Sequence, residues 1–211
     1  MTSKKIDAST VIVLDFETTG LSPDYGDRAI EIGAVKIENG EISESFQTLM
    51  NPGKRINSFI ENYTGITNAM LSKAPSAKEV MLEFHDFIAG YNLVAHNASF
   101  DSRFLESELK RVKRKQQGEF ACSMLIARRI YQNAPNHKLG TLVDYKSLPN
   151  DGTFHRALAD AEMTAYLWLT MLEDIKDKHG IENIPFDMMQ TLSKTAKASC
   201  DKYLSRMALK S

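Results

Sequence analysis

Two acidic residues spaced two positions apart are the first feature of the chain with chemical potential. Asp15 and Glu17 stand at the carboxyl end of a β-branched run that begins at Val11. Because side chains alternate along a strand, both carboxylates project from one face, at the edge where open α/β sheets place their ligand crevice. Such close carboxylates repel each other unless a charge neutralises them, and a divalent cation is the natural candidate. Taken alone, the pair is more simply explained as a solvated strand end.

A third carboxylate, Asp101, follows another predicted strand. The apolar residues 93–95 predict a short strand, and an amphipathic segment starts near Phe100. We expect Ser99 to cap this helix at its amino end, which places Asp101 in the first turn. By itself, an acid in this position is explained by its favourable interaction with the helix dipole.

A histidine and an aspartate five positions apart complete the set. Two helical residues with the spacing of His155 and Asp160 would point roughly 140° apart. We therefore expect His155 on a loop after Gly152 and only Asp160 on the helix that follows. Asp160 borders the apolar stripe of that helix, where an unpaired acid would cost several kcal/mol. His155 alone is more simply explained as a solvated loop residue.

Hydrophobic periodicity and turn signals predict the elements that must position these residues. Apolar or β-branched runs at 11–16, 29–37, 41–50, 93–95 and near 120 predict strands, and Asn39-Gly40 predicts a tight hairpin. A capping box at Ser76-Ala-Lys-Glu79 predicts a helix start, and further helices are predicted at 100–115, 125–131, 156–172 and 186–209. The order predicts an α/β fold, with a mixed five-stranded sheet whose first strands are antiparallel, flanking helices and a C-terminal helical extension.

Composition narrows the class of protein. The chain has 211 residues, of which 43% are hydrophobic and 25% charged, with a net charge of -1. No apolar run approaches the roughly 18 residues of a membrane span, and no secretory signal is apparent at the start. Cys122 and Cys200 lie far apart without metal-type spacing, which predicts a reducing, cytoplasmic location. We place one domain at residues 1–176 and the helical extension at 177–211.

In their order along the chain, these residues resemble a known family. The matching segments are Asp15-Phe-Glu-Thr-Thr-Gly20, His96-Asn-Ala-Ser-Phe-Asp101 and His155-Arg-Ala-Leu-Ala-Asp160. Residues 31–35, 64–66 and 138–142 also look like blocks of this family. Over residues 9–172 the chain is similar to the DEDDh exonucleases, in particular to the DnaQ-like branch that includes the bacterial DNA polymerase III epsilon (proofreading) subunit. The resemblance implies a ribonuclease H-like fold and two divalent cations, Mg2+ or Mn2+.

The resemblance also implies the reaction, which is stepwise hydrolysis of nucleic acid from a 3′ end with release of nucleoside 5′-monophosphates. Asp15, Glu17, Asp101 and Asp160 are expected to hold the metal ions, and Asp15 is expected to bridge them. Two such ions stabilise both the entering and the leaving oxygen of a phosphoryl displacement. His155, whose ordinary pKa is near neutral, is expected to take the proton of the attacking water.

Contacts to the terminal nucleotide follow from the same resemblance. Backbone N–H groups near Thr18 and Thr19 are expected to bind this nucleotide, and Leu21 to wedge against its base. Phe100 is expected to stack on the base, which is chemistry that tolerates any sequence. A core position at a helix start explains Phe100 equally well.

Other contacts leave the choice of nucleic acid open. His96 and Asn97 are expected either to contact substrate or to brace the site through their own hydrogen bonds. The helix before Gly65 offers Phe59 and Thr64 where the epsilon-like branch carries polar contacts to the sugar. Thr64 is kept as a candidate sugar contact, and the sequence does not decide between DNA and RNA.

Three functions therefore stay open. The first is a 3′–5′ exonuclease acting on DNA, preferably on single-stranded or mismatched ends, as a proofreading subunit or a free nuclease. The second is an exoribonuclease that trims RNA ends or short oligonucleotides. The third is a non-catalytic nucleic-acid-binding or polymerase-binding module, which the presence of all five predicted catalytic residues disfavours. The C-terminal extension is expected either to bind a DNA polymerase catalytic subunit or to pack on its own domain.

Overall fold

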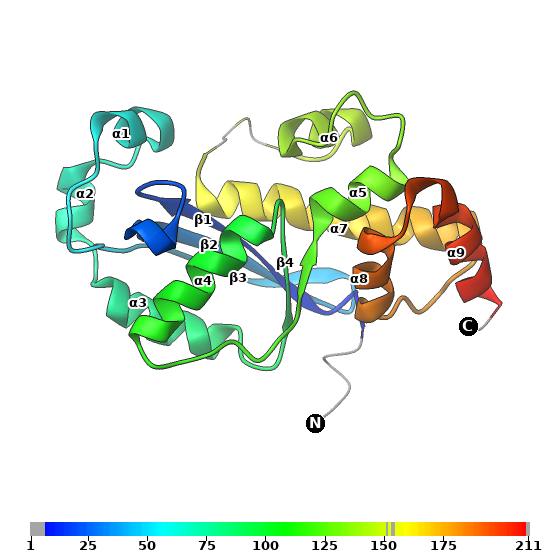
Figure 1. Cartoon of the computed structure of the whole chain (residues 1–211), viewed down its shortest axis with the longest axis horizontal. Coiled ribbons are helices and arrows are strands. Elements are labelled where there is room, and N and C mark those ends of the chain that lie inside the picture. Colours follow the sequence, from blue (N-terminus) through cyan, green and yellow to red (C-terminus); the bar gives the residue numbers. More distant parts are fainter. Residues whose placement is uncertain (1–6, 151, 153–154, 210–211) are drawn as a thin grey trace.

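A five-stranded mixed sheet forms the centre of the molecule (Figure 1). The structure, a computed structural model, describes residues 7–150, 152 and 155–209. The strands run in the order β3-β2-β1-β4-β5, with β1–β2 and β2–β3 antiparallel and β1–β4 and β4–β5 parallel. Their bounds are β1 Val11–Thr18, β2 Ala29–Glu38, β3 Glu41–Leu49, β4 Asn92–Ala95 and β5 Phe120–Cys122. The predicted mixed sheet with antiparallel first strands is confirmed.

The central strand β1 is buried on both faces. Val11 and Val13 pack into the core beneath the long C-terminal helices, whereas Ile12 and Leu14 pack into a second core on the opposite face. This two-residue period explains why the run is almost continuously apolar.

Helices cover both faces of the sheet (Figure 1). The long helix α7 lies across β1 and β2, while α3 and α4 cover the other face. Short helices α1 and α2 extend from the end of β3, and α5, α6, α8 and α9 gather around α7. The bounds are α1 Ser58–Thr64, α2 Asn68–Lys73, α3 Ala77–Phe87, α4 Ser99–Arg111, α5 Ser123–Ile130, α6 Leu139–Lys146, α7 Ala157–His179, α8 Phe186–Lys194 and α9 Cys200–Ala208, with 3-10 turns at Pro23–Tyr25 and Lys197–Ser199.

Several local predictions are confirmed and others are corrected. Asn39 and Gly40 both have positive φ, as the predicted tight hairpin requires, and the Ser76 capping box is formed. Helix α4 begins without a side-chain cap, so the predicted Ser99 cap is wrong. Helix α6 was not predicted.

The predicted single helix over 186–209 is also wrong. Thr195 and Ala196 are extended between α8 and α9. Arg129 of α5 donates a hydrogen bond of 3.1 Å to the Thr195 carbonyl oxygen, which a continued helix would have used internally. A tertiary contact thus accompanies the break in a sequence with good helix propensity.

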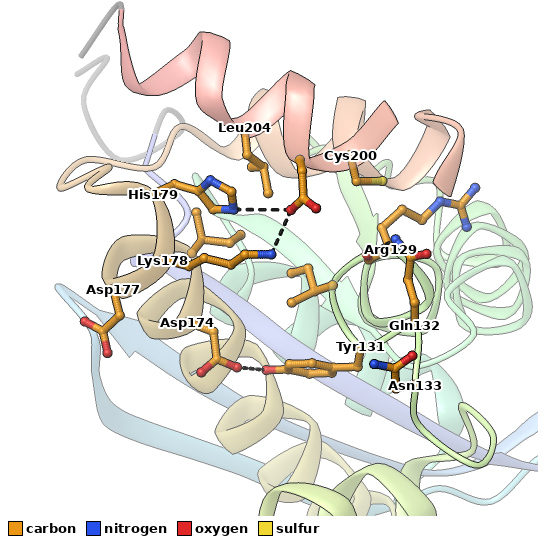
Figure 2. A pocket seen from close by; sticks show the side chains of 13 residues that line it. Arg129, Tyr131, Gln132, Asn133, Asp174, Asp177, Lys178, His179, Cys200 and Leu204 are labelled. Carbon is orange, nitrogen blue, oxygen red and sulfur yellow. Dashed lines mark hydrogen bonds and ion pairs between the residues drawn. The ribbon is translucent and has the colours of Figure 1, made fainter. Parts of the chain in front are cut away.

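The C-terminal segment packs on the domain. Helix α7 continues to His179, across the boundary expected at residue 176. Fully buried side chains of α8 join the core that contains Trp168 of α7 and Val13 of β1. A cavity of about 640 Å³ lies between α5, α7 and α9, and Figure 2 shows the side chains that line it. An ion pair of Lys178 with Asp201, 2.8 Å long, bridges α7 and α9 there. Packing on its own domain, one of the two expectations for this segment, is what the structure displays.

Neither a membrane span nor a disulfide is found in the part of the chain that the structure describes. None of its helices combines the length and apolar character needed to cross a bilayer. Cys122 and Cys200 are both free thiols, and Cys200 is buried.

Because α8 is part of the core, Met189→Ala should destabilise the whole domain. Met189 is fully buried, and truncating a buried methionine costs about 2–5 kcal/mol. We expect a single cooperative urea transition, followed by circular dichroism, with a free energy of unfolding lowered by that amount. The control Met70→Ala, at a site with 36% exposure, should change it by less than about 1 kcal/mol. A separate early transition of the C-terminal segment would contradict this expectation.

Candidate active site

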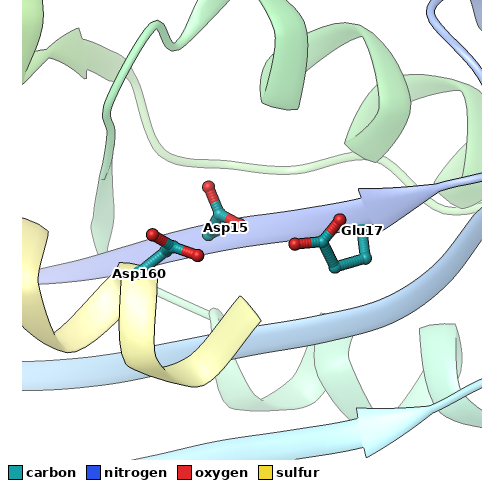
Figure 3. Close-up of side chains that lie close together, drawn as sticks. All are labelled: Asp15, Glu17 and Asp160. Atoms are coloured by element: carbon teal, nitrogen blue, oxygen red, sulfur yellow. The ribbon is translucent and has the colours of Figure 1, made fainter. Parts of the chain in front are cut away.

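An acidic row at the end of β1, made up of Asp15, Glu17 and Asp160, forms the centre of the site. Asp15 and Glu17 continue the alternation of the buried residues Val11 and Val13, so they project from the face that α7 covers. Figure 3 shows both carboxylates on β1 facing Asp160 of α7. Ligand oxygens of these three side chains all lie within 4.8 Å of one another. The structure thus brings together three of the four predicted metal ligands.

Helix α7 reaches this row because Gly33 leaves room for it. Gly33 pairs with Asp15 across β1 and β2. A Cβ atom on Gly33 would lie 2.1 Å from the backbone nitrogen of Leu158 and 2.2 Å from the carbonyl carbon of Ala157. The first turn of α7 therefore packs directly against the backbone at Gly33. This close approach places Asp160 at the end of β1.

An ion pair between Arg156 and the buried Glu31 holds the same turn in place. The fully buried Glu31 carboxylate accepts hydrogen bonds from Arg156 Nη2 at 2.8 Å and Nε at 3.2 Å, and from the Ala157 backbone N–H at 3.1 Å. Glu31 lies opposite Glu17 in the β1–β2 register. Arg156 therefore both anchors α7 to β2 and places a positive charge beside the acidic row.

Asp101 approaches the row from α4. Its side chain is buried, and Oδ1 accepts a hydrogen bond of 3.3 Å from the backbone N–H of Phe16. Asp101 is outside the group of three acids whose ligand oxygens meet within 4.8 Å. Farther along α4, Glu108 accepts hydrogen bonds from Arg28 Nε at 2.7 Å and Nη2 at 2.9 Å. These bonds tie α4 to the start of β2.

His155, in the segment before α7, lines the cleft into which the acidic row opens. Its φ of 61° lies in the left-handed region, a conformation that histidine adopts more often than most residues but at a cost. Its ring centroid lies 4.1 Å from that of Tyr63, with 37° between the ring planes. As predicted, only Asp160 is on the helix, and its carboxylate accepts a hydrogen bond of 3.2 Å from the Arg156 backbone N–H.

Burial and mutual repulsion raise the pKa values of the row. For Asp15, burial is the main cause, followed by the charges of Asp101, Asp160 and Glu17. For Glu17, burial and then the charges of Asp160 and Glu31 raise the pKa to about 8. Burial also raises the pKa of Asp160. Oxygen ligands that converge and repel in this way fit a divalent cation, which would relieve the repulsion.

The row opens into a cleft of about 1010 Å³ with exposed apolar walls. Leu21 is 79% exposed, and Phe59 and Tyr63 on α1 are 69% and 51% exposed. The rings of Phe59 and Tyr63 stack, with centroids 5.9 Å apart and planes within 10°. Exposed aromatic rings in a cleft suit unstacked nucleic-acid bases.

Some of the predicted substrate contacts line the cleft, and others are engaged within the protein; Phe100 does both, since its ring centroid lies 4.9 Å from that of Phe104. Leu21, Asn97 and Phe100 line the cleft. The backbone N–H of Thr19 donates to the Arg28 carbonyl oxygen at 2.8 Å and is thus engaged within the protein. The Thr18 hydroxyl donates to the Gly20 carbonyl oxygen at 2.6 Å.

His96 and Thr64 are held by the protein itself. His96 Nε2 lies 2.9 Å from the His137 carbonyl oxygen, which can only accept, and Nδ1 lies 2.9 Å from Ser123 Oγ. Burial lowers the pKa of His96 to about 4, so its ring is neutral. The buried Thr64 hydroxyl donates to the Ile60 carbonyl oxygen at 2.9 Å. These bonds favour the bracing role for His96 and a structural role for Thr64.

Comparison with known proteins decides the family. A sequence model described as Exonuclease matches residues 12–168 of the chain. The chain belongs to this exonuclease family. The membership and the enzyme class predicted from the three motifs are therefore confirmed.

Curated relatives of this exonuclease are DNA polymerases. The chain is 41% identical over 176 residues to the DNA polymerase III PolC-type of Caldanaerobacter subterraneus subsp. tengcongensis, which covers 82% of this chain. It is 40% identical over 180 residues to that of Bacillus subtilis, which covers 84% of this chain. In both cases the match spans 12% of the relative's own length.

Solved structures share the fold. Exonuclease X in complex with 5′ overhanging duplex DNA superposes with a TM-score of 0.67 at 26% identity, over 87% of this exonuclease and 99% of that chain. The nuclease domain of 3′hExo, a DEDDh family member bound to rAMP, gives a TM-score of 0.69 at 22% identity, over 84% and 96% of the two chains. The predicted ribonuclease H-like fold is confirmed.

Sequence reasoning did not identify several residues that shape the site. Glu31 and Arg156 lie inside motif segments, and an acid within a buried apolar strand is itself a signal that a cation must pair with it. Gly33 lies in the same apolar run. No sequence pattern links Tyr63 to His155, since only the fold brings α1 to the start of α7.

Metal-free protein should lose stability as the pH rises. Burial raises the pKa of Glu17 from 4.5 to about 8 in the folded state, so the folded state holds this proton more tightly than the unfolded chain. The stabilisation is complete below about pH 4.5 and is lost as the pH rises through about 8. Thermal unfolding in EDTA should give a lower Tm at about pH 8.5 than at about pH 6.

Two further measurements check this assignment. Glu17→Gln should flatten the dependence of Tm on pH, because the neutral amide does not titrate. Added Mg2+ should raise the Tm most at the higher pH, where the ligands are deprotonated. A Glu17→Gln variant with the parental dependence would contradict the assigned cause.

Proposed function

We propose that this chain is a metal-dependent 3′–5′ exonuclease that hydrolyses phosphodiester bonds from the 3′ end of DNA, preferably at single-stranded or mismatched ends, and releases nucleoside 5′-monophosphates. The observation that carries the proposal is the convergence of Asp15, Glu17 and Asp160 within 4.8 Å in a cleft that His155 also lines. Membership of the exonuclease family supports the reaction class.

The acidic row would hold the metal. Asp15, Glu17 and Asp160 are the closest ligands, and the buried carboxylate of Asp101 is the fourth candidate. We propose two divalent cations, Mg2+ or Mn2+, because oxygen ligands suit both. When bound, such cations supply an activated water and stabilise charge on the phosphate.

The remaining chemistry belongs to the chain's own side chains. His155 would accept the proton of the attacking water, a role for which an exposed imidazole is suited. Arg156 neutralises Glu31, so that this buried carboxylate adds less repulsion to the row. Leu21 and Phe59 would hold unstacked bases on the cleft walls, in a way that does not depend on sequence.

DNA is the proposed substrate for two reasons. The curated relatives are DNA polymerases, and Exonuclease X, at 26% identity, is seen with duplex DNA that carries a 5′ overhang. Stacking walls do not read the sugar, so RNA hydrolysis is a measurable outcome of the test below.

His155→Ala should fold, retain metal and lose about 10²–10⁴-fold in turnover, which is the range of general-base catalysis. The assay uses 5′-labelled single-stranded DNA and RNA of one sequence with Mg2+, resolved on a gel. The wild type should give a ladder that shortens from the 3′ end, faster with DNA. His85→Ala, on α3 outside the cleft, is the matched control and should retain the parental rate.

Each alternative has its own outcome in this assay. Parental turnover by His155→Ala would remove His155 from the mechanism. Faster hydrolysis of RNA would replace the proposal with an exoribonuclease. If neither strand is shortened and Asp15→Asn behaves like the wild type, the chain is a non-catalytic module.

We further propose that the domain works beside a DNA polymerase catalytic subunit, which contacts its C-terminal helices. The relatives' identity as polymerase III supports this partner. Since α8 belongs to the core, deleting residues 180–211 would unfold the domain and cannot test the contact. Lys202 and Arg206 are exposed on α9 and can be changed without disturbing the core.

A pull-down with a purified polymerase III catalytic subunit should therefore retain the parental chain. Lys202→Glu combined with Arg206→Glu should weaken this retention at least about tenfold, since like-charge contacts at interfaces cost several kcal/mol. The control Lys78→Glu, on the distant helix α3, should bind normally. Equal retention of the parental chain and the α9 variant would exclude this surface.

A further inference from the structure

We infer that Tyr63 is a positioning residue for His155: its ring holds the imidazole at the acidic cleft and stabilises the positive charge that develops there during proton transfer. The inference rests on the proposed exonuclease function and assigns a role to a residue outside the three motifs. It concerns the rate of the reaction rather than the binding of metal.

The contact between the two rings is close. Their centroids are 4.1 Å apart with an interplanar angle of 37°, nearer than the other ring pairs found among the described residues. Tyr63 lies in the last turn of α1, which Gly65 closes with a left-handed φ of 71°. A defined helix end thus presents its ring to a residue from a distant part of the chain.

Tyr63 is itself supported from behind. Phe59, one helical turn earlier, stacks on it with centroids 5.9 Å apart and planes within 10°. Residues four apart on a helix face support each other in this way. Such support limits the positions that the Tyr63 ring can take, and through it those of the imidazole.

His155 needs a support of this kind. Its backbone has a left-handed φ of 61°, which is retained only where surrounding contacts determine it. The Asp160 carboxylate interacts with the charge and the backbone N–H of His155. The segment that carries the imidazole is therefore tied to the acidic row, and the Tyr63 ring contacts the imidazole itself.

The ring also has an electrostatic effect. The face of an aromatic ring attracts a cation, and a general base becomes cationic as it takes up a proton. Tyr63 is close enough to the row for the charges of Glu17, Asp160 and Asp15 to raise its pKa beyond the effect of burial, so the phenol stays neutral. Its contact with His155 is thus strongest after proton transfer, which lowers the barrier rather than the affinity.

The kinetic test separates this role from base stacking. In single-turnover assays with excess enzyme, Tyr63→Leu should lower the rate of cleavage about tenfold and change the affinity for DNA less than about threefold, in line with cation–π contacts of modest exposure. Tyr63→Phe keeps the ring and should retain the rate within about twofold. Tyr145→Leu, on α6 outside the cleft and with 45% exposure, is the matched control and should retain the parental rate.

The decisive comparison repeats Tyr63→Leu in the His155→Ala background. If Tyr63 acts through His155, the second substitution should change the residual rate by less than about twofold. An undiminished tenfold effect in that background would overturn the inference. So would weaker DNA binding with an unchanged cleavage rate, which is the signature of a stacking platform for bases.

A measurement without substrate distinguishes failure of this inference from failure of the proposed function. The chain has five histidines, and the NMR signals of the His155 ring can be assigned by comparison with His155→Ala. Stacking on Tyr63 should shift these signals upfield, and Tyr63→Leu should return them toward ordinary values. Unmoved signals would overturn the inference even in an active enzyme, while moved signals in an inactive protein would retain the positioning role and reject the function.

Discussion

Repulsion among carboxylates at the end of one strand is the constraint around which the fold is arranged. Asp15 and Glu17 are fixed by the alternation of β1, and Asp160 can join them only if α7 comes down onto the sheet. Gly33 supplies the space for that approach, and the Glu31–Arg156 pair supplies the attachment. Rigid packing thus holds like charges close together, which is the arrangement that favours binding of a divalent cation.

Two arginine–glutamate pairs attach the helices that carry acidic residues, one on each face of the sheet. Arg156 ties α7 to β2 on one face, and Arg28 ties α4 to the start of β2 on the other. Glu31 and Glu108 are buried, and losing the arginine partner would leave a costly uncompensated charge in the interior, so each pair holds its helix in one position. The acids that the two helices carry, Asp160 and Asp101, therefore meet β1 from opposite sides.

Much of this arrangement could be predicted from the sequence, because it depends on local periodicity. The two-residue alternation of β1, the Asn39-Gly40 hairpin and the place of Asp160 at the edge of an apolar stripe all follow from short-range geometry. The features that could not be predicted depend on tertiary contacts. Arg129 donates a hydrogen bond to the chain where α8 ends, and Tyr63 contacts His155 from a distant part of the sequence.

Helix α7 also acts as a spacer of fixed length. Asp160 lies in its first turn, and α9 packs at its far end beside Lys178, about 27 Å away at the rise of an α-helix. Because a single rigid helix joins them, the length of α7 fixes the distance between the acidic row and α9.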